Sequence, residues 1–156
     1  MTPATDALDA LDLPYTTVEY PHDPDAGSYA EEAVAHLGVD AMRVFKTLVC
    51  KAETGELLVG IVPTDSQLDL KRVARAAGVK RCAMAEVSEA ERSSGYVAGG
   101  ISPIGQKRLL RTFLHEDAVL HDTIFVSGGR RGLELQLSAD TIVAAVDAVL
   151  ADIART

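Results

Sequence analysis

The sequence predicts one α/β domain in which short helices surround a mixed β-sheet. Short apolar strands alternate with helical segments, and two pairs of strands are separated only by short turns, which is typical of β-hairpins. Hairpins make antiparallel pairs, so we do not expect a doubly wound parallel sheet. The 156 residues show no repeat and no linker, which favours a single domain over residues 1–156.

The N-terminal segment predicts a helix, a strand and a loop. Apolar residues recur at helical spacing from Pro3 to Leu13, and Pro14 ends this pattern. Residues 15–20 are rich in β-branched and aromatic side chains, which favours a strand. The prolines, aspartates and glycine of residues 21–27 then predict a loop.

A second helix is expected over residues 29–37. Ser28 is a suitable N-cap, and Glu31 at the third helical position completes the pattern of a capping box. Gly38 follows the last apolar residue and is a typical helix stop.

A β-hairpin and a basic helix follow. Residues 43–50 and 57–63 read as two apolar strands around a turn that contains Gly55. Residues 69–77 form the basic helix, which ends at Gly78.

The middle of the chain has shorter elements. We expect a strand over residues 80–85 and a short helix over residues 86–92. Residues 95–105 hold four glycines and a proline and predict an ordered loop.

The C-terminal segment predicts another pair of strands and a helix. Residues 123–126 and 133–137 are the strands, and residues 127–132 are the turn between them. Ser138 or Asp140 caps a final helix that runs to about Ile153.

Charge is distributed unevenly, with a net charge of −8. Residues 1–40 contain nine acids and no lysine or arginine, and their acidic pairs are most simply read as a solvated face. Residues 66–111 contain nine bases against four acids. This basic middle could contact RNA phosphates, although on charge alone an ordinary solvated surface is the better interpretation.

Several features favour a cytoplasmic protein without a membrane segment. No apolar run approaches the roughly 20 residues of a membrane helix, and the N-terminus lacks the basic start and apolar stretch of a signal peptide. Cys50 and Cys82 are too few to form a disulfide framework.

Lys46 is the most informative single residue. It lies in an apolar strand, where a lysine is seldom tolerated unless its amine reaches a partner or a cleft. A functional lysine there would offer a positive charge and three donors to a carbonyl, carboxylate or phosphate. The alternative is an edge lysine that extends to water.

Two glycine-containing segments could contact a ligand through the backbone. The loop that contains Gly99 and Gly100 would let amide groups approach an oxyanion, although a tight turn also explains adjacent glycines. The segment 127–132 carries Arg130 and Arg131 and could meet a phosphate, although an exposed turn is the simpler reading.

Other chemistries find little support in the sequence. The histidines lack the partners of a zinc site, there is no Gly-x-Ser-x-Gly elbow, and there is no phosphate-binding P-loop. Cys50 lies in an apolar strand and reads as core packing rather than as a nucleophile. We expect no metal and no cofactor.

Five short motifs in register resemble the YbaK/EbsC family over nearly the whole chain. They are Tyr20 to Pro24, Phe45 to Leu48, Gln67 to Lys71, Gly95 to Gln106, and Val126 to Leu133. The resemblance implies a mixed, barrel-like sheet, the fold of the editing domain that is inserted in bacterial prolyl-tRNA synthetases. It also implies hydrolysis of the ester of mischarged Cys-tRNA(Pro).

The resemblance further implies a set of site residues. Lys46 corresponds to the family's functional lysine, which positions the aminoacyl group, and Gly99 and Pro103 supply a G-x-x-x-P loop. The implied substrate-binding residues are Tyr20, Tyr29, Thr47, Gly99, Gly100, Ile101, Pro103, Ser127, Gly128 and Glu134. The resemblance also implies two departures from the family, since Tyr29 stands where phenylalanine or another residue occurs and Glu134 stands where aspartate is usual.

In the mechanism that the resemblance implies, the substrate's own thiol attacks its ester, and Lys46 and amides near Gly100 supply orientation and charge stabilisation. The expected partners are aminoacyl-tRNA, specifically tRNA(Pro), and prolyl-tRNA synthetase. One alternative is an Ala-tRNA(Pro) deacylase in which water attacks. Another is a non-catalytic module that binds tRNA or the synthetase.

Overall fold

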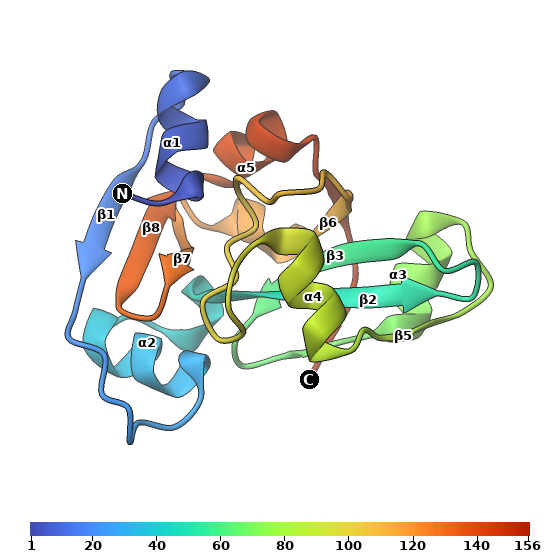
Figure 1. Ribbon diagram of the computed structural model, residues 1–156, viewed down its shortest axis with the longest axis horizontal. Helices are drawn as coiled ribbons and strands as arrows, with labels where there is room; N and C mark the ends of the chain where they lie inside the picture. Colours follow the sequence, from blue (N-terminus) through green and yellow to red (C-terminus); the bar gives the residue numbers. More distant parts are fainter.

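The computed structural model describes residues 1–156 and shows two main sheets with helices around them (Figure 1). The helices are α1 (Pro3–Ala10), α2 (Tyr29–Leu37), α3 (Leu70–Ala77), α4 (Val87–Ser94) and α5 (Ala139–Val146), with 3-10 turns η1 (Ala41–Arg43) and η2 (Glu116–Leu120). The strands are β1 (Thr16–Glu19), β2 (Phe45–Ala52), β3 (Leu57–Pro63), β4 (Gln67–Leu68), β5 (Cys82–Met84), β6 (Arg111–His115), β7 (Ile124–Arg130), β8 (Leu133–Leu137), β9 (Val149–Ala151) and β10 (Ala154–Arg155). No helix is both long enough and apolar enough to cross a membrane.

The larger sheet is mixed, as expected. Its order is β5-β2-β3-β6-β9, in which β2 and β3 form the antiparallel hairpin and β6 and β9 run parallel to their neighbours. A second sheet has the antiparallel order β1-β8-β7, and β4 pairs with β10. The three sheets do not close into a barrel.

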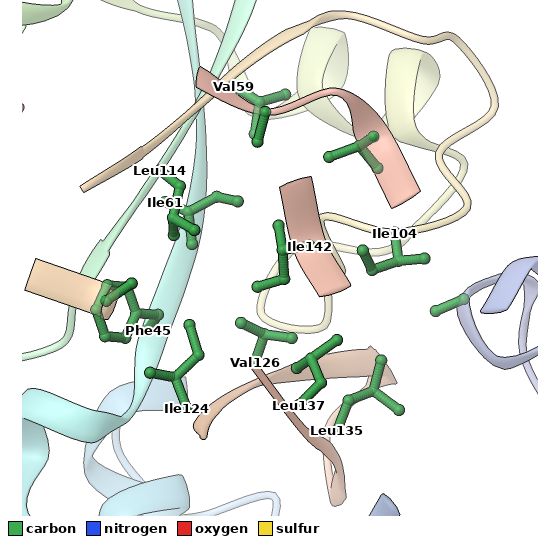
Figure 2. Close-up of a cluster of buried hydrophobic side chains, with 14 of the residues drawn as sticks. Phe45, Val59, Ile61, Ile104, Leu114, Ile124, Val126, Leu135, Leu137 and Ile142 are labelled. Carbon is green, nitrogen blue, oxygen red and sulfur yellow. The ribbon is translucent and has the colours of Figure 1, made fainter. Parts of the chain in front are cut away.

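The main core lies between the two larger sheets. Phe45 of β2 and Ile61 of β3 lie in one cluster with Val126 of β7 and Leu135 of β8, and α5 contributes Ile142 (Figure 2). Because strand side chains alternate between faces, the other face of the larger sheet forms a second cluster. That cluster packs the far face of β2 and β3 against α3. A third, small cluster lies under α2.

The bounds expected for α2 are confirmed. Ser28 caps the helix by accepting a hydrogen bond from the Glu31 amide at 3.2 Å, and Gly38 ends it with a left-handed φ of 65°. The expected capping box is not formed, because the Glu31 side chain makes no return contact to Ser28. Glu31 lies beside a cavity instead.

The expected final helix is wrong in its C-terminal half. Helix α5 ends at Val146, where Asp147 adopts a left-handed φ of 56°. The following residues form β9 beside β6, and Ile153 is completely buried in the second core cluster. Strand β6, which the sequence analysis did not identify, supplies the neighbour that makes β9 a strand.

The expected turn at residues 127–132 is also too long. Strand β7 continues to Arg130, and its pairing with β8 is interrupted by a β-bulge between Ser127 and Arg130. Only residues 131 and 132 form the turn itself.

Candidate functional site

A cavity of about 520 Å³ lies where the two larger sheets meet. Its walls are the N-terminal half of β2, the first turn of α2, one side of α4 and the loop at residues 98–101. Figure 1 shows α4 and this loop in front of β2, with α2 nearby. The lining is largely apolar, and a volume of this size is typical of small-molecule sites. Six residues expected in the site line it: Tyr29, Lys46, Thr47, Gly99, Ile101 and Ser127.

Lys46 contributes an unpaired positive charge to the cavity. Its amine makes no salt bridge and no hydrogen bond with the protein, and the side chain is half-buried. Burial lowers the pKa of this amine, and the negative charge of Asp65 partly offsets that effect. The strand therefore holds a cation against an apolar wall, where its interaction with a bound anion or carbonyl is stronger than in water.

Thr47 adds a buried hydroxyl without a protein partner. Only three buried side-chain atoms lack a hydrogen-bond partner: Thr47 Oγ1, the Tyr20 hydroxyl and Glu134 Oε2. All three belong to residues that the family resemblance indicated. Buried polar atoms are almost always hydrogen-bonded, so three unpartnered atoms in and behind one cavity point to a functional site.

Tyr29 connects the cavity to a buried polar cluster behind it. Its hydroxyl donates a 2.6 Å hydrogen bond to Oε1 of Glu134, which has no exposed surface. Burial raises the pKa of Glu134 to about 8, so this carboxyl group is largely protonated at neutral pH. Burial is the main cause that raises the pKa of Tyr20 to about 12, and the charge of Glu134 adds to it. Tyr20 and Glu134 support the cavity wall rather than line the cavity.

Gly100 has a different role from the one expected. Its amide donates to the Val97 carbonyl at 2.9 Å, so it is not free to face an oxyanion. A Cβ at Gly100 would lie 2.9 Å from the Cα of Arg130, which shows that the loop packs tightly on the β7–β8 turn. The neighbouring residues Gly99 and Ile101 do line the cavity, and no hydrogen bond within the protein occupies their amides.

Three other expected residues are distributed around the loop. Ser127 lines the cavity, and its hydroxyl accepts from the Gly129 amide at 3.2 Å. Gly128 does not line the cavity, and a Cβ there would lie 2.6 Å from Cγ of Leu133, so this glycine serves packing within the hairpin. Pro103 is buried on the side of α1, away from Lys46, and shapes the loop without reaching the cavity.

Sequence reasoning missed an ion cluster that fixes the cavity's outer wall. Glu32 of α2 accepts from the Asp23 amide at 2.9 Å, contacts His22 at 2.8 Å and pairs with Arg131 at 3.0 Å. Burial would raise the pKa of Glu32, but the Asp23 amide, His22 and Arg131 outweigh it and hold the pKa at about 2. Arg131 also donates to the Gly27 carbonyl at 3.1 Å. The reading of the acidic pairs as a solvated face is therefore wrong for Glu32, which is 4% exposed.

Some lining residues also lay outside the expected set. Thr64 directly after β3, Met84 of β5 and Ala98 of the loop border the cavity, although no local pattern in the sequence marks them. They come from three separate segments, so only the tertiary fold brings them together.

The chain's own thiols are poor nucleophiles. Cys50 is completely buried on the far face of β2, and burial together with Cys82 raises its pKa to about 12. Burial also raises the pKa of Cys82. Cys50 is therefore a core residue, as the sequence analysis expected. No group of histidine, cysteine, aspartate and glutamate is arranged to hold a metal ion.

Comparisons with known proteins found one family model and several relatives. A family model described as an aminoacyl-tRNA editing domain matches residues 23–144. EbsC of Enterococcus faecalis, whose provisional name is Cys-tRNA(Pro)/Cys-tRNA(Cys) deacylase, is 36% identical over 90% of this chain and 85% of its own. YwhH of Bacillus subtilis, a protein without an assigned function, is 24% identical over 69% of this chain and 68% of its own.

Solved structures show the same fold. A structure described provisionally as a trans-editing enzyme for prolyl-tRNA synthetase matches 99% of this chain and 96% of its own, with a TM-score of 0.86 and 24% identity. The hypothetical protein APE2540 matches 98% of this chain and 99% of its own, with a TM-score of 0.87 and 23% identity.

Proposed function

Because this chain belongs to the aminoacyl-tRNA editing domain family, we propose that it is a trans-editing deacylase that hydrolyses the ester of mischarged Cys-tRNA(Pro). The provisional name of its relative EbsC supports the substrate, and the match covers most of both chains. The proposal assigns the terminal aminoacylated adenosine of the tRNA to the cavity beside β2.

The observation that carries this proposal is the pairing of two unsatisfied polar groups in one apolar cavity. Lys46 and Thr47 both line the cavity, and neither the Lys46 amine nor the buried Thr47 hydroxyl has a protein partner. The amides of Gly99 and Ile101 lie on the same lining. Such groups match the carbonyl and ribose oxygens of an aminoacyl ester, and the apolar surface suits a small side chain.

The cavity favours a reaction in which the protein orients the substrate rather than attacks it. Neither cysteine of the chain is available as a thiolate, so we assign the attack to the substrate's own thiol. Its sulfur bonds to the ester carbonyl carbon, and the bond from that carbon to the ribose oxygen then breaks. The thiol proton passes to the ribose oxygen, which yields free tRNA and a cyclic thiolactone that water opens to cysteine.

Lys46 has the central role in this scheme. Its positive charge stabilises the oxyanion that develops on the carbonyl oxygen, and the amides of Gly99 and Ile101 replace Gly100 as candidate donors. A preorganised charge in a partly dry site contributes more to the transition state than to the neutral ester. Orientation of the thiol against the carbonyl supplies the remaining acceleration.

The proposed partners are tRNA(Pro) and prolyl-tRNA synthetase. The synthetase produces the mischarged substrate, and docking on it would add tRNA selectivity to a domain of this size. A salt-sensitive association of the chain with the tRNA-loaded synthetase would support this part of the proposal.

The test compares ester loss from Cys-tRNA(Pro) with ester loss from Ala-tRNA(Pro), with and without prolyl-tRNA synthetase. We expect fast release of cysteine and much slower release of alanine, because alanine has no thiol. Equal rates would favour attack by water, as in an Ala-tRNA(Pro) deacylase. No acceleration for either substrate would contradict the proposal and favour a module that only binds tRNA.

A further inference from the structure

A second groove, also of about 520 Å³, lies along α3 and the segment that leads from it to β5. Four basic residues line it: Lys71, Arg75, Lys80 and Arg81. All four are exposed, and none of them makes a salt bridge. The rest of the lining is mostly apolar. Four of the nine bases in residues 66–111 are therefore gathered along this one groove.

The arrangement on α3 brings like charges together. Lys71 and Arg75 are one helical turn apart on the same face, a spacing at which like charges destabilise an isolated helix. Arg72 lies between them in sequence but turns to the opposite side, where it binds Asp152 at 3.0 Å and the Ala154 carbonyl at 2.6 Å. The structure therefore neutralises Arg72 and leaves the groove cations without partners.

Hydrogen bonds to the Glu53 carboxylate fix the backbone of the opposite wall of the groove. Oε1 of Glu53 accepts hydrogen bonds from the amides of Lys80 and Arg81 at 3.0 and 3.1 Å. The hydrogen bond from the Arg81 amide is the main cause that lowers the pKa of Glu53. The amide and the charge of Lys80 lower it further. This carboxylate therefore fixes the backbone of the wall and leaves the guanidinium of Arg81 unpaired.

Strand β5 connects this groove to the proposed reaction cavity. Cys82 at its start lines the groove, and Met84 at its end lines the cavity. Two residues of extended chain span about 7 Å, so the two sites adjoin. Because α3 packs on the far face of the sheet, a polyanion whose end occupies the cavity would cross the edge strand β5 to reach the groove.

We propose that this groove binds the phosphate backbone of the tRNA next to its aminoacylated end. The proposal rests on the function proposed above, and it names the surface that holds the RNA. Ammonium and guanidinium groups without protein partners are the donors that phosphates prefer. The acidic residues 1–40 would repel RNA elsewhere on the molecule and so help to orient it.

The test measures the affinity of an uncharged tRNA(Pro) transcript for an Arg75→Gln, Lys80→Gln double variant as a function of salt. Each phosphate contact releases counterions, so loss of two contacts should raise the Kd at least about tenfold at 0.1 M salt. The slope of log K against log salt should also decrease by about 1.5. Uncharged tRNA carries no ester, so the result is independent of whether the chain is a deacylase.

A Lys107→Gln, Arg108→Gln variant is the matched control, because it removes one lysine and one arginine at exposed positions outside the groove. Its Kd should remain within about twofold of the wild-type value. Equal losses in both variants would overturn the proposal, because net charge alone would explain them. An unchanged Kd in the groove variant, with weaker binding to prolyl-tRNA synthetase, would also overturn it and assign the groove to an acidic protein surface.

Discussion

The hydroxyl of Tyr29 donates a 2.6 Å hydrogen bond to Oε1 of Glu134. These are the two positions at which the family resemblance implied a departure from the usual residues. The structure places the two side chains in direct contact, with the tyrosine as donor and the glutamate as acceptor. The pair forms part of the wall behind the cavity that contains Lys46.

Replacing Tyr29 with phenylalanine should destabilise the fold. Glu134 has no exposed surface and its Oε2 already lacks a partner, so the variant leaves both carboxyl oxygens unsatisfied. We expect a loss of about 1–2 kcal/mol in the free energy of unfolding, measured by urea denaturation. Tyr15→Phe is the control, because its hydroxyl bonds to Asp9 at an exposed position and should matter little. Equal losses in the two variants would contradict the buried pairing.

The raised pKa of Glu134 predicts a dependence of stability on pH. Between its ordinary value of 4.5 and its folded value of about 8, the folded chain keeps a proton that the unfolded chain has released. This contribution is fully present below pH 4.5 and is lost as the pH rises toward 8. Relative to Glu134→Gln, the wild type should lose stability with a slope approaching about 1.4 kcal/mol per pH unit. A constant difference between pH 5 and pH 8 would show that Glu134 is ionised throughout.

Gly100→Ala should disturb the loop rather than the chemistry. The added Cβ would lie 2.9 Å from the Cα of Arg130 and 3.1 Å from the amide of Arg131, and backbone atoms cannot easily move aside. We expect a loss of about 1–3 kcal/mol in the free energy of unfolding, seen as a lower Tm. In Gly27→Ala the new atom meets only the flexible end of Glu31, so that variant should keep the wild-type Tm.

The chain's cysteines should be dispensable for turnover. Cys50 lies on the far face of β2, and both thiols have raised pKa values, so neither serves as the nucleophile in our scheme. Cys50→Ala and Cys82→Ala should each hydrolyse Cys-tRNA(Pro) at a rate within about twofold of the wild type, measured under single-turnover conditions. A folded variant that loses the reaction would assign the attack to the protein.

Local signals in the sequence were sufficient for several elements. The N-cap Ser28 and the stop Gly38 define α2, and the alternation of strand and turn residues defines the β2–β3 hairpin. Lys46 also stood out locally, because an apolar strand seldom tolerates a lysine unless its amine reaches a cleft, a partner or water. Its position in the cavity follows from the same strand.

Long-range contacts explain what the sequence did not reveal. The ion pair of Glu32 and Arg131 joins residues that are 99 positions apart, so neither can be recognised as buried from its neighbours in sequence. Strand β9 exists only because β6 lies beside it. Gly100 looked like a ligand contact, but its lack of a side chain serves the packing on Arg130.

The most direct test of the account is the single-turnover rate of ester loss from Cys-tRNA(Pro) with wild type, Lys46→Ala and Lys46→Arg. We expect Lys46→Ala to lose at least about a hundredfold in rate, because a preorganised charge at a developing oxyanion contributes that much or more. Its Tm should stay near the wild-type value, since the amine makes no hydrogen bond or salt bridge. Lys46→Arg should recover part of the rate by restoring the charge. A folded Lys46→Ala protein with the wild-type rate would contradict the central claim that Lys46 and its cavity carry out the reaction.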